Sequence, residues 1–273
     1  MANRMKYLKT STVLAVISAV ILSASCSVKE DRTPCPSYLT VYYHEAVPVM
    51  EENGIHTGVI TTVTNSAAFR FRSDVDPAEY PEGLEVPVLP KSIATVSAIA
   101  GVMTSEVGED VLTYRRGAEP DRIWAVSDPV DCTGELAEYV VVLHKQYAVM
   151  RVIFKGADEY ANLRMEVHGN FNAFETSTLI PVKGAFYTDM RHVHGEIWEV
   201  VVPRQGDDAL SLRLYDGDEY LYDVPVGKNL ATAGYNWSKR DLDDFEVFLD
   251  WAVPEVGIKI APWRDGGEEN HII

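Results

Sequence analysis

Basic residues are scarce in this 273-residue sequence. It has 24 Lys and Arg against 41 Asp and Glu, so its formal net charge at pH 7 is −17. This acidity argues against a nucleic-acid-binding protein, which would present a basic surface to phosphates. Cysteine is also rare. Three residues are too few for a disulfide-rich scaffold, and their spacing is not that of a zinc site.

The sequence also lacks the common catalytic and cofactor-binding motifs. It contains no Gly-x-Ser-x-Gly, His-Glu-x-x-His, phosphate-binding glycine loop or dinucleotide-binding fingerprint. His192 and His194 could supply half of a metal site, but no further ligands stand at a suitable spacing. Residues 216–219 are interpreted as a hairpin turn rather than a calcium loop, and the acidic run over residues 241–246 as solvated surface charge. We therefore expect no enzyme, no metal and no cofactor.

The first 25 residues have the character of a secretory signal. Arg4, Lys6 and Lys9 form a basic start, and residues 13–22 are nearly all apolar but too few to span a bilayer. Small residues follow and end at Cys26, which is typical of a lipoprotein signal. Ser23 occupies the position that is usually aliphatic, with Leu22 one step earlier. The alternative is an ordinary secretory signal with an unmodified cysteine.

Cleavage before Cys26 would change the charge and the attachment of the chain. It removes three basic residues and no acidic one, which takes the net charge from −17 to −20. No cofactor is expected beyond the covalent lipid on Cys26, a diacylglycerol with an N-acyl chain. Several acyl chains on one residue hold a protein far more firmly than one chain does. We expect a lipid-anchored body without a transmembrane helix.

Charged residues follow the lipidation site closely. Lys29, Glu30 and Asp31 resemble the export signal that places lipoproteins on the outer face of the outer membrane in Bacteroidetes-type bacteria. The alternative interpretation is a solvated, charged tether. The residues alone do not distinguish the two.

Two cysteines remain once Cys26 is assigned to the lipid. Cys35 and Cys132 could form a disulfide in an oxidising envelope compartment, closing a loop worth about 4 to 5 kcal/mol by chain-entropy arithmetic. The alternative is two free thiols. Neither cysteine belongs to a recognisable catalytic signature.

Most of the remaining sequence has the pattern of β-strands. Apolar residues alternate with polar ones in several segments, for example Leu163, Met165 and Val167, which indicates strands with one buried face. Residues 139–143 and 148–154 flank residues 144–146, which suggests a hairpin or two neighbouring strands. Other expected strands are 39–43, 59–64, 68–72, 93–100, 123–126, 196–202, 210–214, 220–226, 245–251 and 256–260. Residues 92–99 could also form a short helix.

Packed sheets are the arrangement that such alternation favours. A change in composition at residues 128–134 suggests a domain boundary. We expect a signal peptide at 1–25, a tether at 26–37, an N-terminal β-sandwich at 38–133 and a C-terminal β-sandwich at 134–273. The five tryptophans, spread over the strands, are interpreted as packing residues rather than a glycan-binding platform.

The chain resembles the FimB-type fimbrial anchor subunits of Bacteroidales. The resemblance lies in the lipidation site Cys26, the acidic tether, Cys35-Pro36, the strand at 39–43 and the late segment 258–263. It implies an all-β protein of two tandem transthyretin-like β-sandwich domains. It also implies an outer-membrane lipoprotein that anchors the base of a fimbria, limits its length and joins the stalk subunit by strand addition. The C-terminal strand at 256–260 and the tail at 264–273 are candidates for that contact.

Two other functions are compatible with the sequence. A surface lipoprotein could bind a glycan or another ligand on a sandwich face through tryptophan and tyrosine side chains. An envelope hydrolase is a more remote alternative, because no catalytic constellation is visible. The expected partners are the fimbrial stalk subunit and, through the lipid, the outer membrane, with no nucleic acid.

Overall fold

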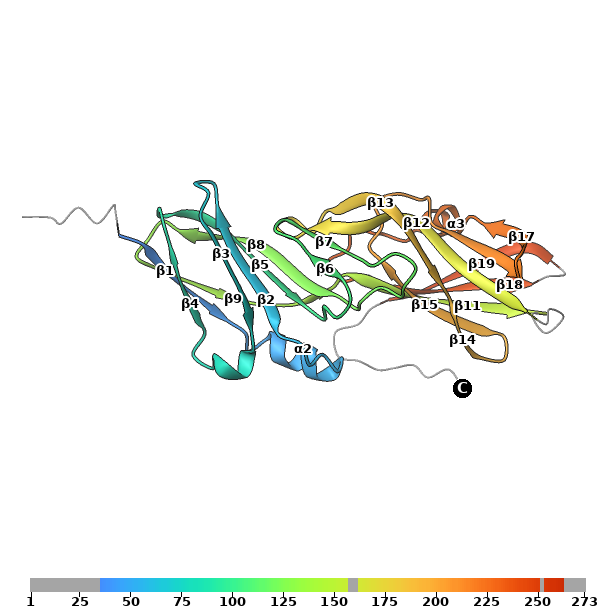
Figure 1. The fold of residues 1–273 in the computed structure, drawn as a ribbon, viewed down its shortest axis with the longest axis horizontal. Coiled ribbons are helices and arrows are strands. Elements are labelled where there is room, and N and C mark those ends of the chain that lie inside the picture. The colour runs from blue at the N-terminus through green and yellow to red at the C-terminus, as the bar shows by residue number, and fades with distance from the viewer. Residues whose placement is uncertain (1–34, 157–161, 251–252, 263–273) are drawn as a thin grey trace, which may run out of the picture. The chain divides into compact units, whose positions relative to one another are not determined.

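Strands form most of the structure, a computed structural model that describes residues 35–156, 162–250 and 253–262 (Figure 1). Alternation in the sequence becomes alternation in burial. In β1 (Ser37–Tyr42), for example, Ser37, Leu39 and Val41 are buried, whereas Tyr38 is exposed. Two short α-helices occur among the described residues, α2 (Ala46–Glu52) and α3 (Val226–Thr232). Neither has the length and apolar character that crossing a membrane requires.

The first sandwich consists of a three-stranded and a five-stranded sheet. In the three-stranded sheet, β1 lies between two partners and is antiparallel to one and parallel to the other. These are β4 (Leu84–Val88) and β9 (Leu136–Val140). The five-stranded sheet has the order β10 (His144–Lys145), β8 (Trp124–Cys132), β5 (Ser92–Ala100), β2 (Val59–Asn65) and β3 (Arg70–Val75). A 3-10 helix, η1 (Pro77–Glu79), precedes β4.

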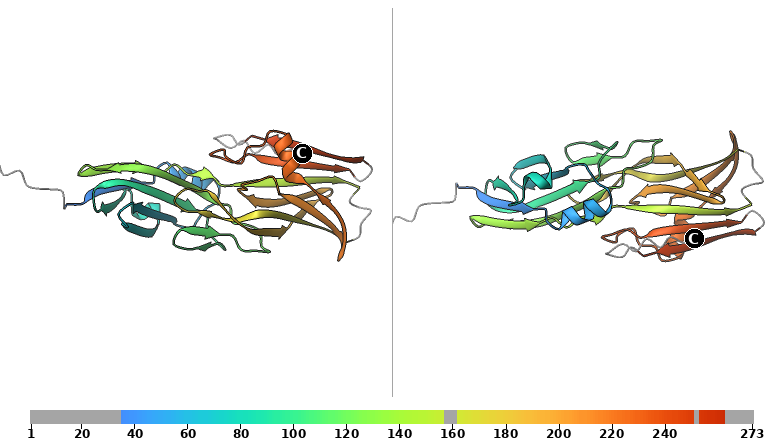
Figure 2. Two further views of the ribbon diagram at one scale, coloured as in Figure 1. Left: turned by 90° about the horizontal axis from the view of Figure 1, so that it is seen from above. Right: turned by 90° about the horizontal axis from the view of Figure 1, so that it is seen from below.

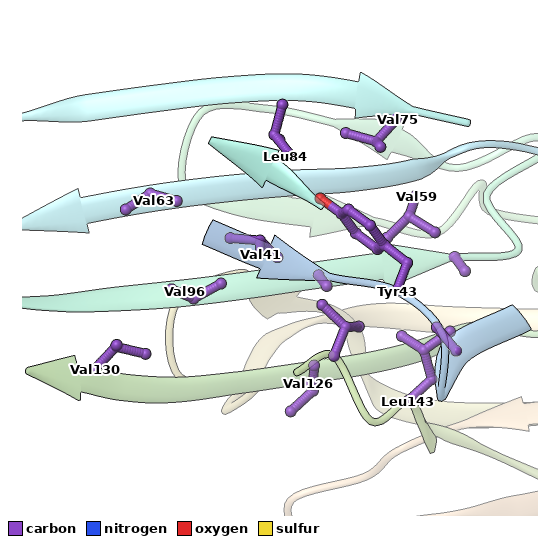
Figure 3. Close-up of a cluster of buried hydrophobic side chains, with 14 of the residues drawn as sticks. Val41, Tyr43, Val59, Val63, Val75, Leu84, Val96, Val126, Val130 and Leu143 are labelled. Carbon is purple, nitrogen blue, oxygen red and sulfur yellow. The ribbon is translucent and has the colours of Figure 1, made fainter. Parts of the chain in front are cut away.

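Aliphatic side chains from both sheets fill the first core. Val41 and Leu84 from one sheet pack with Val59, Val63 and Val96 from the other (Figure 3). One polar pair lies in this core: the Tyr43 hydroxyl lies 2.8 Å from the Thr61 hydroxyl oxygen. Burial raises the pKa of Tyr43 to about 12, so the phenol stays neutral and can serve as a hydrogen-bonding group.

The second sandwich is built from a five-stranded and a six-stranded sheet. The first has the order β14 (Arg191–His194), β15 (Ile197–Pro203), β11 (Tyr147–Lys155), β18 (Asp244–Asp250) and β19 (Val253–Ala261). The second has the order β17 (Glu219–Val224), β16 (Ser211–Asp216), β12 (Leu163–Glu175), β7 (Val111–Thr113) and β6 (Glu106–Val107), and β13 (Pro181–Asp189) also pairs with β12. Figure 2 shows β18 and β19 (red) and the β14 region (orange) at opposite borders of their sheet in both views.

The second core contains more large side chains, such as phenylalanine and methionine, than the first. Phe154, Phe186 and Phe245 are almost completely buried, together with Met150 and Met165. Trp198 lies in this core and Trp124 in the first one. The interpretation of these two tryptophans as packing residues is therefore confirmed.

A short strand from the first half of the sequence completes the six-stranded sheet. β7 pairs antiparallel with the end of β12, where Leu112 lies opposite Phe174. Both side chains belong to a small third cluster with Ile99, Tyr114 and Ile123. Strands from both halves of the sequence therefore share one sheet and one cluster of buried side chains.

The predicted fold class, all-β with β-sandwiches, is confirmed. Residues 92–99 lie in a strand, and Asp216 and Gly217 form the expected turn into β17. Of the two arrangements suggested around residues 144–146, a hairpin or two neighbouring strands, the hairpin is wrong. The chain leaves β9 in one sheet, pairs briefly as β10 with β8 in a second, and enters a third as β11. The domain limits stay a prediction; β9, which follows the proposed boundary at residue 133, pairs with β1.

Candidate functional site

The predicted lipidation and export residues precede the described part of the chain. Cys26, Lys29, Glu30 and Asp31 all lie outside the described residues. The description begins at Cys35, two residues before β1 starts. The assignments at 26–31 therefore stay predictions.

The start of β1 and Cys132, the last residue of β8, lie at the same end of the first sandwich. Tyr38 pairs with Leu136, and the Tyr38 N–H donates to the Glu135 carbonyl at 2.9 Å, so the start of β1 lies beside the turn after β8. Cys35 is exposed, Cys132 is buried, and both are free thiols in this structure. Burial raises the pKa of the Cys132 thiol, and the neighbouring Asp131 carboxylate adds to this rise. The disulfide between them stays a prediction.

Strand β19 is a sheet edge of the kind that strand addition requires. It pairs with β18 on one side, and no other described strand lies on its second side. Val256, Ile258 and Ile260 pack against the second core, whereas Lys259 is exposed and donates to Glu246 at 3.1 Å. An edge with this alternation offers backbone groups for pairing and a regular row of side chains for register.

Two other edges, those of β3 and β14, are covered or shorter. Arg72 from β3 donates to the Gly108 carbonyl at 2.8 Å, and Arg70 pairs with Asp110, so the 107–110 segment is attached to that edge. β14 has four residues and an irregular register with β15. Protection of this kind is how natural sheets avoid unwanted pairing. β19 is therefore the best-formed candidate edge in its sheet.

A groove lies beside β8, next to β10. It encloses about 360 Å³, and its walls come from β8, the turn that joins β12 and β13, and the segment 237–240. Arg204 crosses its base: Nε donates to Gln146 Oε1 at 3.1 Å, and the guanidinium also donates to the Trp237 and Arg240 carbonyls. Burial lowers the pKa of Arg204. With its donors satisfied internally, this side chain acts mainly as a structural bridge.

The acidic run over residues 241–246 is not solvated as predicted. Asp243 is buried and pairs with Lys239, and Asp244 accepts from the Val149 N–H at 2.6 Å. Asp241 accepts from the Lys145 N–H at 2.8 Å and lies 2.8 Å from His144 Nδ1. Burial alone would raise the pKa of Asp241, but these hydrogen bonds lower it below its usual value. The run is a structural element because it meets buried donors from β10 and β11.

Aromatic residues line the outer surface of the six-stranded sheet. The rings of Tyr215 and Tyr220 lie 5.9 Å apart, and the Arg164 guanidinium lies 4.3 Å from the Tyr215 ring. Nearby, His168 and Tyr187 stack at 6.0 Å. Flat rings and planar hydrogen-bonding groups on one sheet face are compatible with ligand binding.

The weak metal candidates are not assembled into a site. His192 and His194 are exposed on β14, and His192 Nε2 bonds with the Gly195 carbonyl at 2.8 Å. Within the described residues, no group of three or more His, Cys, Asp or Glu side chains could hold a metal ion.

The sequence did not reveal the groove, and it suggested a sandwich face with tryptophan and tyrosine side chains without identifying its residues. Arg204, Gln146 and the 237–240 segment come from separate parts of the chain, and no local motif connects them. Tyr215 and Tyr220 had a visible signal, because they flank a predicted hairpin turn. That signal did not reveal that Arg164 and His168 would lie on the same sheet face.

Comparisons with known proteins identify the fold. No protein-family model and no curated protein matches the sequence. Among solved structures, the fimbrial anchor protein Mfa2 from Porphyromonas gingivalis is similar, with a TM-score of 0.57 and 12% identity over 84% of this chain and 98% of that chain.

Two structures from Bacteroides species are similar to this chain to nearly the same degree. A candidate polysaccharide-binding protein from Bacteroides thetaiotaomicron has a TM-score of 0.56 and 15% identity over 83% of this chain and 95% of that chain. A candidate adhesin from Bacteroides ovatus has a TM-score of 0.56 and 14% identity over 89% of this chain and 99% of that chain. None of the three is described as an enzyme. At these identities the comparisons establish a shared fold.

Proposed function

We propose that this chain is an outer-membrane lipoprotein that anchors the base of a fimbria to the cell surface and limits fimbrial length. The observation that carries the proposal is the fold, which nearly the whole of a fimbrial anchor protein shares with this chain. The protein has a structural role and no enzymatic one. Its partners are the stalk subunit and, through the lipid on Cys26, the outer membrane.

Attachment and polymer contact fall to different parts of the chain. Cys26 carries the diacylglycerol and N-acyl lipid, and Lys29, Glu30 and Asp31 direct the protein to the outer face of the membrane. The stalk subunit adds a strand to the open edge of β19. Backbone hydrogen bonds supply the affinity, and the alternation of Val256, Ile258 and Ile260 fixes the register of the added strand.

Deletion of the gene tests the proposal directly. Cells without the protein should release fimbriae into the medium, and the released polymers should be longer than normal, as measured by electron microscopy. Complementation with the wild-type gene should restore both properties. Fimbriae that stay attached at normal length in the deletion strain would contradict the proposal.

Binding of a glycan is a second candidate function, and the aromatic face of β12, β13, β16 and β17 favours it. Tyr215 and Tyr220 could stack on sugar rings while Arg164 and Glu166 form hydrogen bonds with hydroxyl groups. Calorimetry with purified surface polysaccharides tests this function. Binding that disappears in Tyr215→Ala but persists in Tyr42→Ala, on the other sandwich, would support it.

A further inference from the structure

Four large apolar side chains are exposed at the end of the first sandwich where β1 begins. Their exposed fractions are 78% for Leu136, 62% for Ile93, 47% for Leu89 and 42% for Tyr38. The strand register brings them to one end. Tyr38 lies opposite Leu136, Leu89 follows directly after β4, and Ile93 is the second residue of β5. These four residues are called the apolar tip below.

The apolar tip surrounds the end of the sandwich instead of covering one face. Tyr38 and Leu136 point outward from the three-stranded sheet, because their neighbour Leu39 points into the core. Ile93 points outward from the five-stranded sheet, because Ala94 is buried. Leu89, Ile93 and Leu136 lie within about two residues, or roughly 7 Å, of a turn, and Tyr38 is the second residue of β1. The tip could therefore enter a soft apolar layer without any change in the fold.

Charge is distributed unequally between the two ends of this sandwich. The turns at the apolar tip, residues 65–69, 89–91 and 131–135, carry three charged residues, Lys91, Asp131 and Glu135. At the opposite end, residues 44–54 and 76–83 carry no Lys or Arg, while Arg122 and the buried Lys145 lie beside the start of β8. The acidic residues of the two segments are Glu45, Glu51, Glu52, Asp76, Glu79 and Glu82. An anionic membrane surface would repel the acidic end and tolerate the tip.

The sequence limits how far the tip can lie from the lipid. Cys35 follows Cys26 by nine residues, and an extended chain spans at most about 3.6 Å per residue, or roughly 32 Å in total. The end of the sandwich that this chain enters is the end that carries the apolar tip. Lipidation of Cys26 would therefore keep the tip beside the bilayer.

We infer that the apolar tip rests in the interfacial layer of the outer membrane and gives the anchor a fixed orientation, with its acidic end facing away. The inference rests on the lipidation of Cys26 proposed above. Interfacial groups of this kind are buried to a depth of about 5–10 Å, which matches the height of the tip. The lipid supplies the attachment, and the tip defines which end of the protein faces the membrane.

Spin-label accessibility measures the contact. The lipidated protein, with Cys35→Ser and Cys132→Ser, is placed in phosphatidylethanolamine–phosphatidylglycerol vesicles with a nitroxide at Ile93→Cys. The matched control is Ile180→Cys, because Ile180 is 58% exposed in the second sandwich. The tip label should collide with a water-soluble nickel chelate several-fold less often than the control label, and with oxygen more often.

The outcomes separate this inference from the proposed function. Equal nickel collisions at both positions in protein that floats with the vesicles would overturn the inference and leave the lipid anchor intact. Failure to float would overturn the lipidation and the inference together. A tip label that is already shielded in unlipidated Cys26→Ala protein without vesicles would show that a second copy or another segment covers the tip, and would also overturn it.

Hydrogen–deuterium exchange provides a second measurement, without labels and with Cys35 and Cys132 unchanged. In wild-type lipoprotein on vesicles, amides of residues 88–93 should exchange several-fold more slowly than in unlipidated Cys26→Ala protein. Amides of residues 178–180 should exchange at the same rate in both. Unchanged exchange at residues 88–93 would contradict the inference.

Discussion

The ammonium group of Lys145 lies 2.5 Å from the carboxylate of Asp244, and the lysine side chain is 1% exposed. The pair connects β10 to the start of β18, 99 residues later. Burial lowers the pKa of Lys145, and the Asp244 carboxylate opposes that shift. A charge this deeply buried depends on its partner.

Replacement of Asp244 by Ala should destabilise the fold by roughly 2–4 kcal/mol, because it leaves a buried ammonium without this carboxylate. Urea unfolding measures the change. Adding Lys145→Met to Asp244→Ala should recover part of the loss, since it removes the buried charge. A double variant that is as unstable as the sum of the two single variants would contradict this account.

Asp121 should make stability depend on pH in the acid range. Its carboxylate accepts hydrogen bonds from the N–H groups of Met103, Thr104 and Ser105, each at 2.8 Å. Burial raises the pKa of Asp121, but these hydrogen bonds outweigh burial and lower it. The stabilisation is complete above the usual aspartate pKa of about 4 and is lost as the pH falls through the lower folded-state value.

The Asp121→Asn variant should therefore lose about 1–3 kcal/mol at neutral pH and less in acid. Thermal unfolding between pH 2 and 7 measures both effects. Asp218→Asn, in the turn between β16 and β17, is a suitable control. An Asp121→Asn penalty that stays constant down to pH 2 would argue against the assigned role.

Cys35 and Cys132 should be oxidised in protein isolated from the cell envelope. The start of β1 lies beside the turn after β8, and Cys35 precedes β1 by two residues, so a bond would close the end of the sandwich where β1 begins. Thiol counting under denaturing conditions should find none without reductant and two after reduction in Cys26→Ala protein. Two thiols without reductant would refute the disulfide.

Cys26→Ala should move the protein from the membrane fraction to the soluble envelope fraction or the medium. The matched control is Cys35→Ala, which removes a thiol but leaves the lipidation site intact and should stay with the membrane. Fractionation and immunoblotting measure the distribution. Membrane association that is unchanged in Cys26→Ala would refute lipidation at this residue.

A photo-crosslinker at Lys259, on the open edge of β19, should capture the stalk subunit in fimbriated cells. The same crosslinker at Val193, on β14 at the other border of the sheet, is the control. Capture at Val193 but not at Lys259 would show that the stalk subunit contacts β14 instead of β19, and would contradict this proposal.

The sequence was informative wherever local alternation determined the structure. The alternation of Leu163, Met165 and Val167 predicted β12, and Asp216 with Gly217 predicted the turn into β17. Pairing between distant strands was not predictable in this way. Nothing near residue 136 indicates that β9 lies parallel to β1, because that choice depends on contacts about 100 residues apart.

Polar residues were harder to interpret than apolar ones. The run over residues 241–246 has the composition of solvated charge, and its burial depends on donors at His144, Lys145 and Val149. The groove depends on Arg204 reaching two separate segments, at Gln146 and at residues 237–240. Such contacts are properties of the assembled fold, and a local pattern of charges does not contain them.

The central position of β1 determines how the first sandwich responds to force. A pull on the chain before Ser37 acts along β1, which is bonded to β4 on one side and β9 on the other. Extraction would have to shear both rows of backbone hydrogen bonds together instead of opening them one at a time from an edge. A strand in this position resists a load far better than an edge strand would, so the point at which the chain enters the fold is also a point of high mechanical strength.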